Sequence, residues 1–135
     1  MNNLFRSPAW HLACLGALIA ATGCGKKLPE LPKTYPVTGK VTVGGGKSGE
    51  GLAINFKCVE NPSFNGTALV TSDGTYKASA LPRVAGLVAG DYEVWLEEGT
   101  AAKGVLADKY KKTETSGLKL NVKAGDNPPF DISLE

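Results

Sequence analysis

Histidine is almost absent from this sequence of 135 residues, and the only one, His11, lies close to the amino terminus. Serine and cysteine hydrolases use a histidine as general base, and most zinc sites use histidine as a ligand. No histidine follows His11, so neither kind of site can form in the rest of the chain. No cofactor motif is present either, and we predict a protein that is not an enzyme.

The sequence also lacks a strong charge imbalance and a long apolar run. Its net charge is +2 and its lysines are spread along the chain, which gives no reason to expect a nucleic-acid partner. The apolar stretch at residues 12–21 (LACLGALIAA) has 10 residues, whereas a membrane-spanning helix needs about 20. Arg6 precedes this stretch, and a positive residue before a short apolar core is typical of an export signal. We expect residues 1–23 to be a signal peptide.

The signal ends in Ala21-Thr22-Gly23-Cys24. This tetrapeptide resembles the lipobox of bacterial lipoproteins, in which small residues precede an obligatory cysteine, although Ala21 stands where leucine is commonest. The resemblance implies cleavage before Cys24, a diacylglycerol thioether on its sulfur, and a further acyl chain such as palmitate on the new amino terminus. Two or more chains anchor a protein stably to a membrane. The alternatives are an ordinary secreted protein cut nearby and a short uncleaved anchor.

Cysteine is scarce as well, with three in the chain. Cys14 would leave with the signal and Cys24 would carry lipid, so Cys58 would have no partner for an internal disulfide. Cys58 continues an alternating apolar set in residues 52–58, which predicts a buried thiol that packs like a small hydrophobic side chain. The alternative, a reactive or intermolecularly paired cysteine, requires exposure.

After Cys24 the composition changes twice. Residues 24–36 carry three prolines between charged residues, which predicts an extended tether. From residue 37 to residue 135, apolar and polar residues alternate in short runs, the pattern of half-buried strands. The runs lie at residues 37–43, 52–58, 91–98, 118–123 and 130–134, with two more inside 67–79.

Strands with one solvent-exposed face are typical of antiparallel sheets. The sequence indicates no helix longer than a turn or two. We therefore predict an all-β domain over residues 37–135, a single antiparallel β-sandwich of about seven strands. The dipeptide Asp73-Gly74 separates the two runs inside residues 67–79, and its glycine tolerates the positive φ of a tight turn. We expect these two runs to form a hairpin.

Several segments of this domain resemble one family. They are VTGKVTVGGG from Val37, the Thr71 to Tyr76 turn (TSDGTY) and Gly-Asp-Tyr-Glu-Val at residues 90–94. Together they look like the carboxypeptidase regulatory-like domains, which are transthyretin-like β-sandwiches. The carboxyl-terminal segment is similar to small lipoproteins of planctomycete-type bacteria. The resemblance implies a fold and an accessory role, and it implies no peptidase machinery.

Two aromatic residues are candidates for contact with a partner. Alternation places Trp95 with Glu93 and Glu97 on the polar face of its strand, and exposed tryptophans often mark surfaces that bind sugars or proteins. The alternative is that the long connection at residues 99–116 folds over Trp95, with Val105, Leu106 and Tyr110 packed on that outer face. Phe64 lies on a predicted loop and is the second candidate.

Acidic residues beside turns do not predict a metal site. Asp73, Asp91 and Asp126 each adjoin a turn residue, but none belongs to a dense set of oxygen ligands. We interpret them as turn formers.

The sequence as a whole predicts a lipid-anchored module of the cell envelope that binds or supports a partner without catalysis. The partner would be an envelope protein or a carbohydrate. Gly25, in place of aspartate after the lipidated cysteine, implies by resemblance the outer membrane rather than the inner membrane. The alternative function is a carrier for a carbohydrate or a small apolar ligand.

Overall fold

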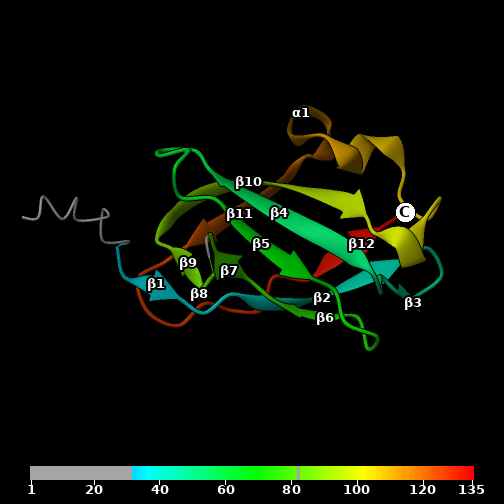
Figure 1. Ribbon diagram of the computed structural model, residues 1–135, viewed down its shortest axis with the longest axis horizontal. Coiled ribbons are helices and arrows are strands. Elements are labelled where there is room, and N and C mark those ends of the chain that lie inside the picture. Colours follow the sequence, from blue (N-terminus) through cyan, green and yellow to red (C-terminus); the bar gives the residue numbers. More distant parts are fainter. Residues whose placement is uncertain (1–31, 82) are drawn as a thin grey trace, which may run out of the picture. The chain divides into compact units, whose positions relative to one another are not determined.

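The computed structural model describes residues 32–81 and 83–135, so the predicted signal peptide and Cys24 lie outside the described residues. The described residues form an all-β fold, as predicted (Figure 1). Seven strands are three to nine residues long: β2 (Thr38–Val43), β4 (Leu52–Cys58), β5 (Gly66–Leu69), β6 (Thr75–Lys77), β10 (Gly90–Glu98), β11 (Leu118–Val122) and β12 (Ile132–Leu134). These seven strands correspond to the seven alternating runs.

Short elements fill the connections. Five strands have two residues each: β1 (Thr34–Tyr35), β3 (Lys47–Ser48), β7 (Ser79–Ala80), β8 (Val84–Ala85) and β9 (Leu87–Val88). The helical elements are the 3₁₀ turns η1 (Thr100–Ala102) and η2 (Asp108–Lys111) and the single-turn helix α1 (Thr113–Ser116). Runs this short are too brief to show a period of two, which is why the two-residue strands were not predicted.

The largest sheet has six strands in the order β11-β10-β4-β5-β7-β8, all paired antiparallel. Its longest strand, β10, pairs with β4 from Tyr92 to Glu98 and with β11 from Gly90 to Val94. The second sheet has the order β12-β2-β3, and β6 also pairs with β2. β10, β4, β5 and β7 therefore each have a paired strand on both sides.

One pairing departs from the antiparallel prediction. β12 runs parallel to β2, with Ile132 opposite Val41 and Leu134 opposite Val43. Parallel strands need a long connection rather than a tight turn, and nearly the whole domain lies between these two. The first and last long strands of the domain are therefore neighbours.

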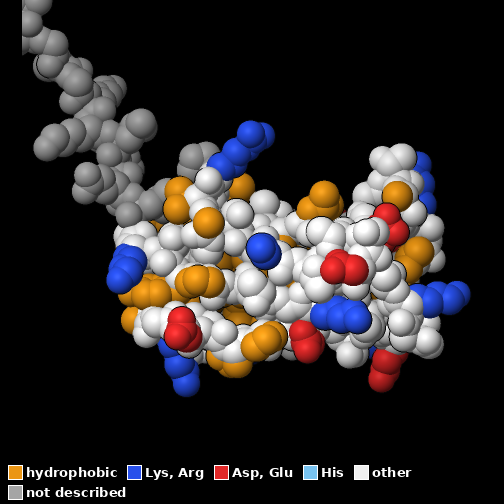
Figure 2. Space-filling model, turned by 90° about the horizontal axis from the view of Figure 1, so that it is seen from below, with side chains coloured by type: hydrophobic (Ala, Val, Ile, Leu, Met, Phe, Trp, Pro, Cys, Tyr) orange, Lys and Arg blue, Asp and Glu red, His pale blue; other side chains and the backbone are white. Residues whose placement is uncertain are grey.

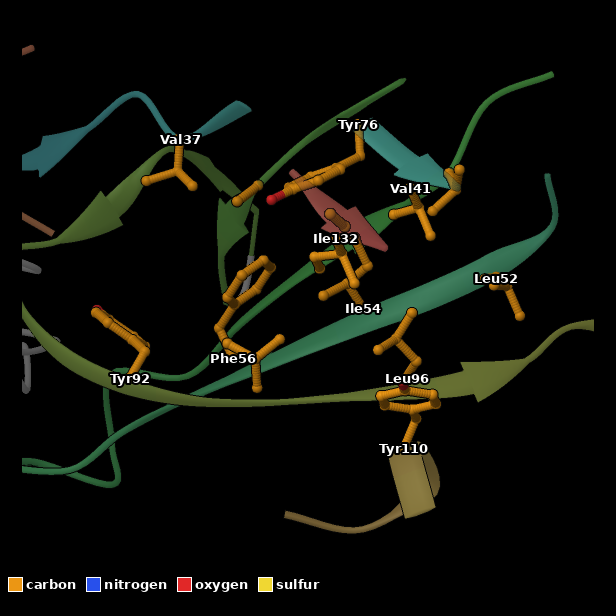
Figure 3. Packing of buried hydrophobic residues seen from close by; sticks show 14 of the residues in the cluster. Val37, Val41, Leu52, Ile54, Phe56, Tyr76, Tyr92, Leu96, Tyr110 and Ile132 are labelled. Carbon is orange, nitrogen blue, oxygen red and sulfur yellow. The ribbon is translucent and has the colours of Figure 1, made fainter. Parts of the chain in front are cut away.

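The core lies where the inward faces of these strands meet. Figure 3 shows side chains from β4 and β10 pointing toward those of β2, β6 and β12. The predicted alternation is confirmed along β4, where residues 52, 54, 56 and 58 are all at most 2% exposed. Each fully buried Leu, Ile or Phe side chain contributes about 1.5–3 kcal/mol through the hydrophobic effect, and this burial stabilises the domain.

The hairpin predicted at Asp73-Gly74 is wrong, although the turn itself forms. The Gly74 N–H donates to the Thr71 carbonyl over 2.9 Å and Gly74 has a φ of 84°. The flanking strands then separate, because β5 pairs with β4 and β7 whereas β6 pairs with β2. The turn therefore carries the chain from one sheet to the other.

The fold begins inside the segment predicted as a tether. Thr34 and Tyr35 form β1, which pairs antiparallel with Val88 and Leu87 of β9. The Thr34 hydroxyl also donates to the Ala85 carbonyl over 2.8 Å, so β1 is held by β8 as well. The last residues of the 24–36 segment are thus extended, as predicted, but they belong to a sheet.

Candidate functional site

The outer face of the six-stranded sheet is the candidate binding surface. It is made by side chains that alternate with the buried ones on β4, β5, β10 and β11, and we call this set the outer face: Ala53, Asn55, Lys57, Thr67, Leu69, Asp91, Glu93, Trp95, Glu97, Lys119 and Asn121. The strand register places Trp95 opposite Asn55, and Asn55 opposite Thr67. An aromatic residue therefore lies in a row with an amide and a hydroxyl.

Trp95 is half-buried on this face, and its indole N–H donates to the Glu97 carboxylate over 3.3 Å. Its neighbours Val94 and Leu96 are fully buried on the opposite side of β10. The alternation that predicted Trp95 on the polar face is confirmed. A half-exposed indole whose N–H is already hydrogen-bonded offers a flat apolar surface. Tryptophan is enriched at interfaces for this reason.

The long connection after β10 packs against the core rather than on the outer face. Leu106 and Tyr110 are 5% and 7% exposed and belong to the hydrophobic core (Figure 3), whereas Val105 is 45% exposed. The alternative that Leu106 and Tyr110 fold over Trp95 on the outer face is therefore wrong for these two residues. The reason is that β11 begins at Leu118, opposite Val94, so residues 95–98 of β10 have no partner from β11 and leave a free edge for the connection to close.

Polar contacts fix the connection at that edge. The Ser116 hydroxyl donates to the Val94 carbonyl over 2.5 Å, and the Leu106 N–H donates to the Glu98 carboxylate over 2.8 Å. The Leu106 N–H is the main cause that holds the pKa of Glu98 below its ordinary value, and Lys111, 3.5 Å away, adds to it. Closure of this edge protects backbone groups that another chain could otherwise pair with.

Beside Trp95, the Asn55 side chain has an unusual amide. Its Nδ2 is buried and has no hydrogen-bond partner within the described part of the chain. A buried donor without a partner costs about 1–3 kcal/mol. Asn55 therefore places a buried, unpaired donor directly opposite Trp95 in the strand register.

A hollow of about 480 Å³ opens on the same sheet, at the β10 and β11 end. Its charged and polar lining comes from Asp91, Glu93, Lys119 and Asn121, and exposed Val59 borders it. The Asn121 amide donates to the Asp91 carboxylate over 2.6 Å, and this bond holds together the two side chains that line one side of the hollow. The hollow carries both donors and acceptors, and its lining has two carboxylates and one ammonium group.

Phe64, the second aromatic candidate, does not join this surface. It is half-buried and packs against the core, and its N–H donates to the Asn61 carbonyl over 2.9 Å in a turn before β5. The structure therefore does not bring Phe64 and Trp95 to one face.

Asn55 was not predicted as a site residue. Its unpaired amide depends on which strands are neighbours, and no local sequence pattern indicates that.

Cys58 is buried, as predicted, with 2% of its surface exposed. Its thiol donates to the Glu60 carboxylate over 3.3 Å, and that carboxylate also accepts the Asp91 N–H. The pKa of Glu60 lies below its ordinary value because backbone N–H groups, first its own and then that of Asp91, stabilise the charged form. The Glu60 carboxylate thus links Cys58 at the end of β4 to Asp91 at the start of β10.

Within residues 32–81 and 83–135, no group of three or more histidine, cysteine, aspartate or glutamate side chains is placed to hold a metal ion. In the same part of the chain, no helix has the length and apolar character required to span a membrane. Cys24, the predicted lipidation site, lies outside the described residues. No protein-family model, curated protein or solved structure matches this chain.

Proposed function

We propose that this protein is a lipid-anchored lipoprotein of the cell envelope whose β domain binds or supports a partner without catalysis. The observation that carries the proposal is Cys24, which follows an apolar signal-like run and the small residues Ala21, Thr22 and Gly23. Acyl chains on Cys24 would anchor the chain in a membrane, and the outer membrane is the better match because Gly25 follows the cysteine. Residues 25–33 would then connect that anchor to β1.

The fold that we propose for the domain is a transthyretin-like β-sandwich of the carboxypeptidase regulatory-like kind. The support is the core, which is built from inward side chains of both the six-stranded sheet and the β2 sheet. Domains of this kind carry their functions on surfaces and loops rather than in the fold itself. The absence of histidine after His11 leaves no histidine base for a serine or cysteine hydrolase.

The outer face is the surface that we propose for partner contact. Trp95 supplies a half-exposed aromatic surface, and the polar side chains of Asn55 and Glu97 flank it. Aromatic residues in a setting of this kind commonly dominate binding energy. An envelope protein is the partner that we favour, since the side chains of the outer face come from four adjacent strands.

The second candidate is a carrier for a carbohydrate. Trp95 favours it, because a sugar ring can stack on a half-exposed indole. The hollow beside Glu93 and Lys119 would extend such a site along β10. A glycan retained through purification of the wild type, and lost on Trp95→Ala, would favour the carrier over the protein-binding module.

Metabolic labelling with a fatty-acid analogue tests the lipid anchor directly. The wild type and a Cys58→Ala control should both take up the label, whereas Cys24→Ala should not. Equal labelling of the wild type and Cys24→Ala would reject the lipoprotein proposal.

Crosslinking in intact cells tests the contact surface. The wild type should capture an envelope partner, and Trp95→Ala should reduce the capture strongly, since loss of a central aromatic residue costs about 2 kcal/mol or more in binding. Val105→Ala is the matched control, because it removes an exposed aliphatic side chain away from the outer face. Equal loss in the two variants would exclude a specific role of Trp95.

A further inference from the structure

The chain enters the β domain at one end of the molecule, beside β8 and β9 (Figure 1). Thr34 lies opposite Val88 in the strand register, and its hydroxyl donates to Ala85. Lys33, Leu81, Arg83 and Val84 are exposed around this point, and we call these four residues the entry end. Lys33 lies next to β1 and is the member of the entry end closest along the chain to Cys24.

Exposed aliphatic side chains gather there. Leu81 is 48% exposed and Val84 is 38% exposed, and they lie three positions apart on either side of Arg83. Figure 2 shows hydrophobic side chains at the end of the molecule where β1, β8 and β9 lie, with basic and acidic side chains at the same end. Single exposed aliphatic residues are common on protein surfaces, and apolar side chains beside Lys and Arg are one feature of surfaces that bind anionic membranes.

The charges of the entry end have one sign. Residues 32–36 and 83–85 contain Lys33 and Arg83 and no acidic residue. Among the described residues, neither cation takes part in an ion pair, and the Lys33 ammonium lies 5.7 Å from the ring centroid of Tyr35. Both cations are available to the phosphates of a lipid surface, and Tyr35 is of the residue type enriched at membrane interfaces.

Only a short segment lies between the proposed anchor and the fold. Residues 25–33 separate Cys24 from β1, and at roughly 3.1 Å per residue an extended tether of this size reaches about 30 Å at most. We propose that the entry end docks on an anionic lipid surface, with Leu81 and Val84 at headgroup level and Lys33 and Arg83 on phosphates. This inference rests on the proposed lipid anchor, which raises the effective concentration of the entry end at the membrane.

Site-directed spin labelling of the full lipoprotein in vesicles tests the docking. The label is placed at Val84→Cys in a Cys58→Ala background, with Leu69→Cys and Val105→Cys as matched exposed aliphatic controls. In vesicles that contain phosphatidylglycerol, collisions of the label at position 84 with a water-soluble nickel chelate should fall several-fold. The controls should show the same collision rates in vesicles with and without phosphatidylglycerol. A label at Leu81→Cys repeats the measurement if the first variant does not fold.

Two charge-reversal variants test whether attraction to lipid phosphates, rather than the nearness of the anchor alone, holds the entry end at the membrane. Arg83→Glu should restore the nickel collisions at position 84, whereas Lys47→Glu, at an exposed position of β3, should not. A label at position 84 as accessible as the one at 105, in protein that is bound to vesicles, would overturn the docking and leave the lipid anchor intact. Protein that takes up no fatty-acid label and stays in the soluble fraction would overturn both.

Discussion

The hydroxyl of Tyr76 donates to the carbonyl of Phe130 over 2.6 Å, across 54 residues of sequence. This bond joins β6 to the segment that precedes β12, and the Tyr76 ring lies over Gly39 of β2. Burial, and then the charge of Asp131, raise the pKa of Tyr76 above its ordinary value, so the hydroxyl stays protonated and remains a donor. Three segments far apart in the chain are thereby fixed to one another.

Tyr76→Phe should destabilise the domain by about 1–3 kcal/mol, because it leaves the Phe130 carbonyl without its donor in a part-buried position. Urea denaturation followed by circular dichroism measures the change. Tyr35→Phe is the control, since Tyr35 is only half-buried and packs at the margin of the core. Equal stability of Tyr76→Phe and the wild type would show that the bond contributes nothing net.

Gly39→Ala should destabilise the fold more severely than most single methyl additions. A Cβ at this position would lie 2.1 Å from the Phe130 carbonyl oxygen, a backbone atom that cannot rotate away. Overpacking of this kind costs about 1–3 kcal/mol and occasionally more.

Gly44→Ala is the matched control for that change, because a Cβ there meets nothing within 4 Å. Thermal unfolding should therefore separate the two variants clearly. If both variants melted with the wild type, β2 and the segment before β12 would have to lie further apart than the structure places them.

The turn at Asp73 predicts a defined pH dependence. The hydroxyls of Thr71 and Thr75 and the Thr75 N–H donate to its carboxylate and lower the pKa of Asp73 from 3.8 to about 2. A lowered pKa means that the contribution to stability is complete above about pH 3.8 and is lost as the pH falls toward 2.

Asp73→Asn should accordingly lower the urea midpoint near neutral pH, and the gap from the wild type should close as the pH approaches 2. Asp126→Asn, at an exposed position in another turn, should leave the midpoint unchanged at each pH. A gap for Asp73→Asn that stayed constant down to pH 2 would mean that the carboxylate charge is not what stabilises this turn.

Leu106→Ala should detach the connection at residues 99–116 and cost about 2–5 kcal/mol, because a buried leucine is replaced by a smaller side chain. Its neighbour provides the control: Val105→Ala, at an exposed position, should change stability by less than about 0.5 kcal/mol. Hydrogen exchange of the β10 edge should increase in the first variant only. Equal effects of the two substitutions would contradict the packing of Leu106 in the core.

The sequence by itself determined which side of each long strand is buried. The side-chain period of a strand is two, so the alternation in residues 52–58 and 91–98 identifies inward residues without knowledge of any partner strand. The same reasoning placed Trp95 outward and Cys58 inward, and the structure agrees at both positions. Glycine at position 74 was enough to predict a tight turn, because positive φ is a local property.

Only the tertiary structure decided which strands are neighbours. The turn at Asp73-Gly74 looks like a hairpin in sequence, yet its two strands enter different sheets, because the partners β4, β7 and β2 lie elsewhere in the chain. The parallel pairing of β2 with β12, the burial of Leu106 and Tyr110, and the unpaired Asn55 amide beside Trp95 have the same origin. Periodicity is a property of one strand, whereas pairing and packing depend on contacts between residues far apart, which no local pattern records.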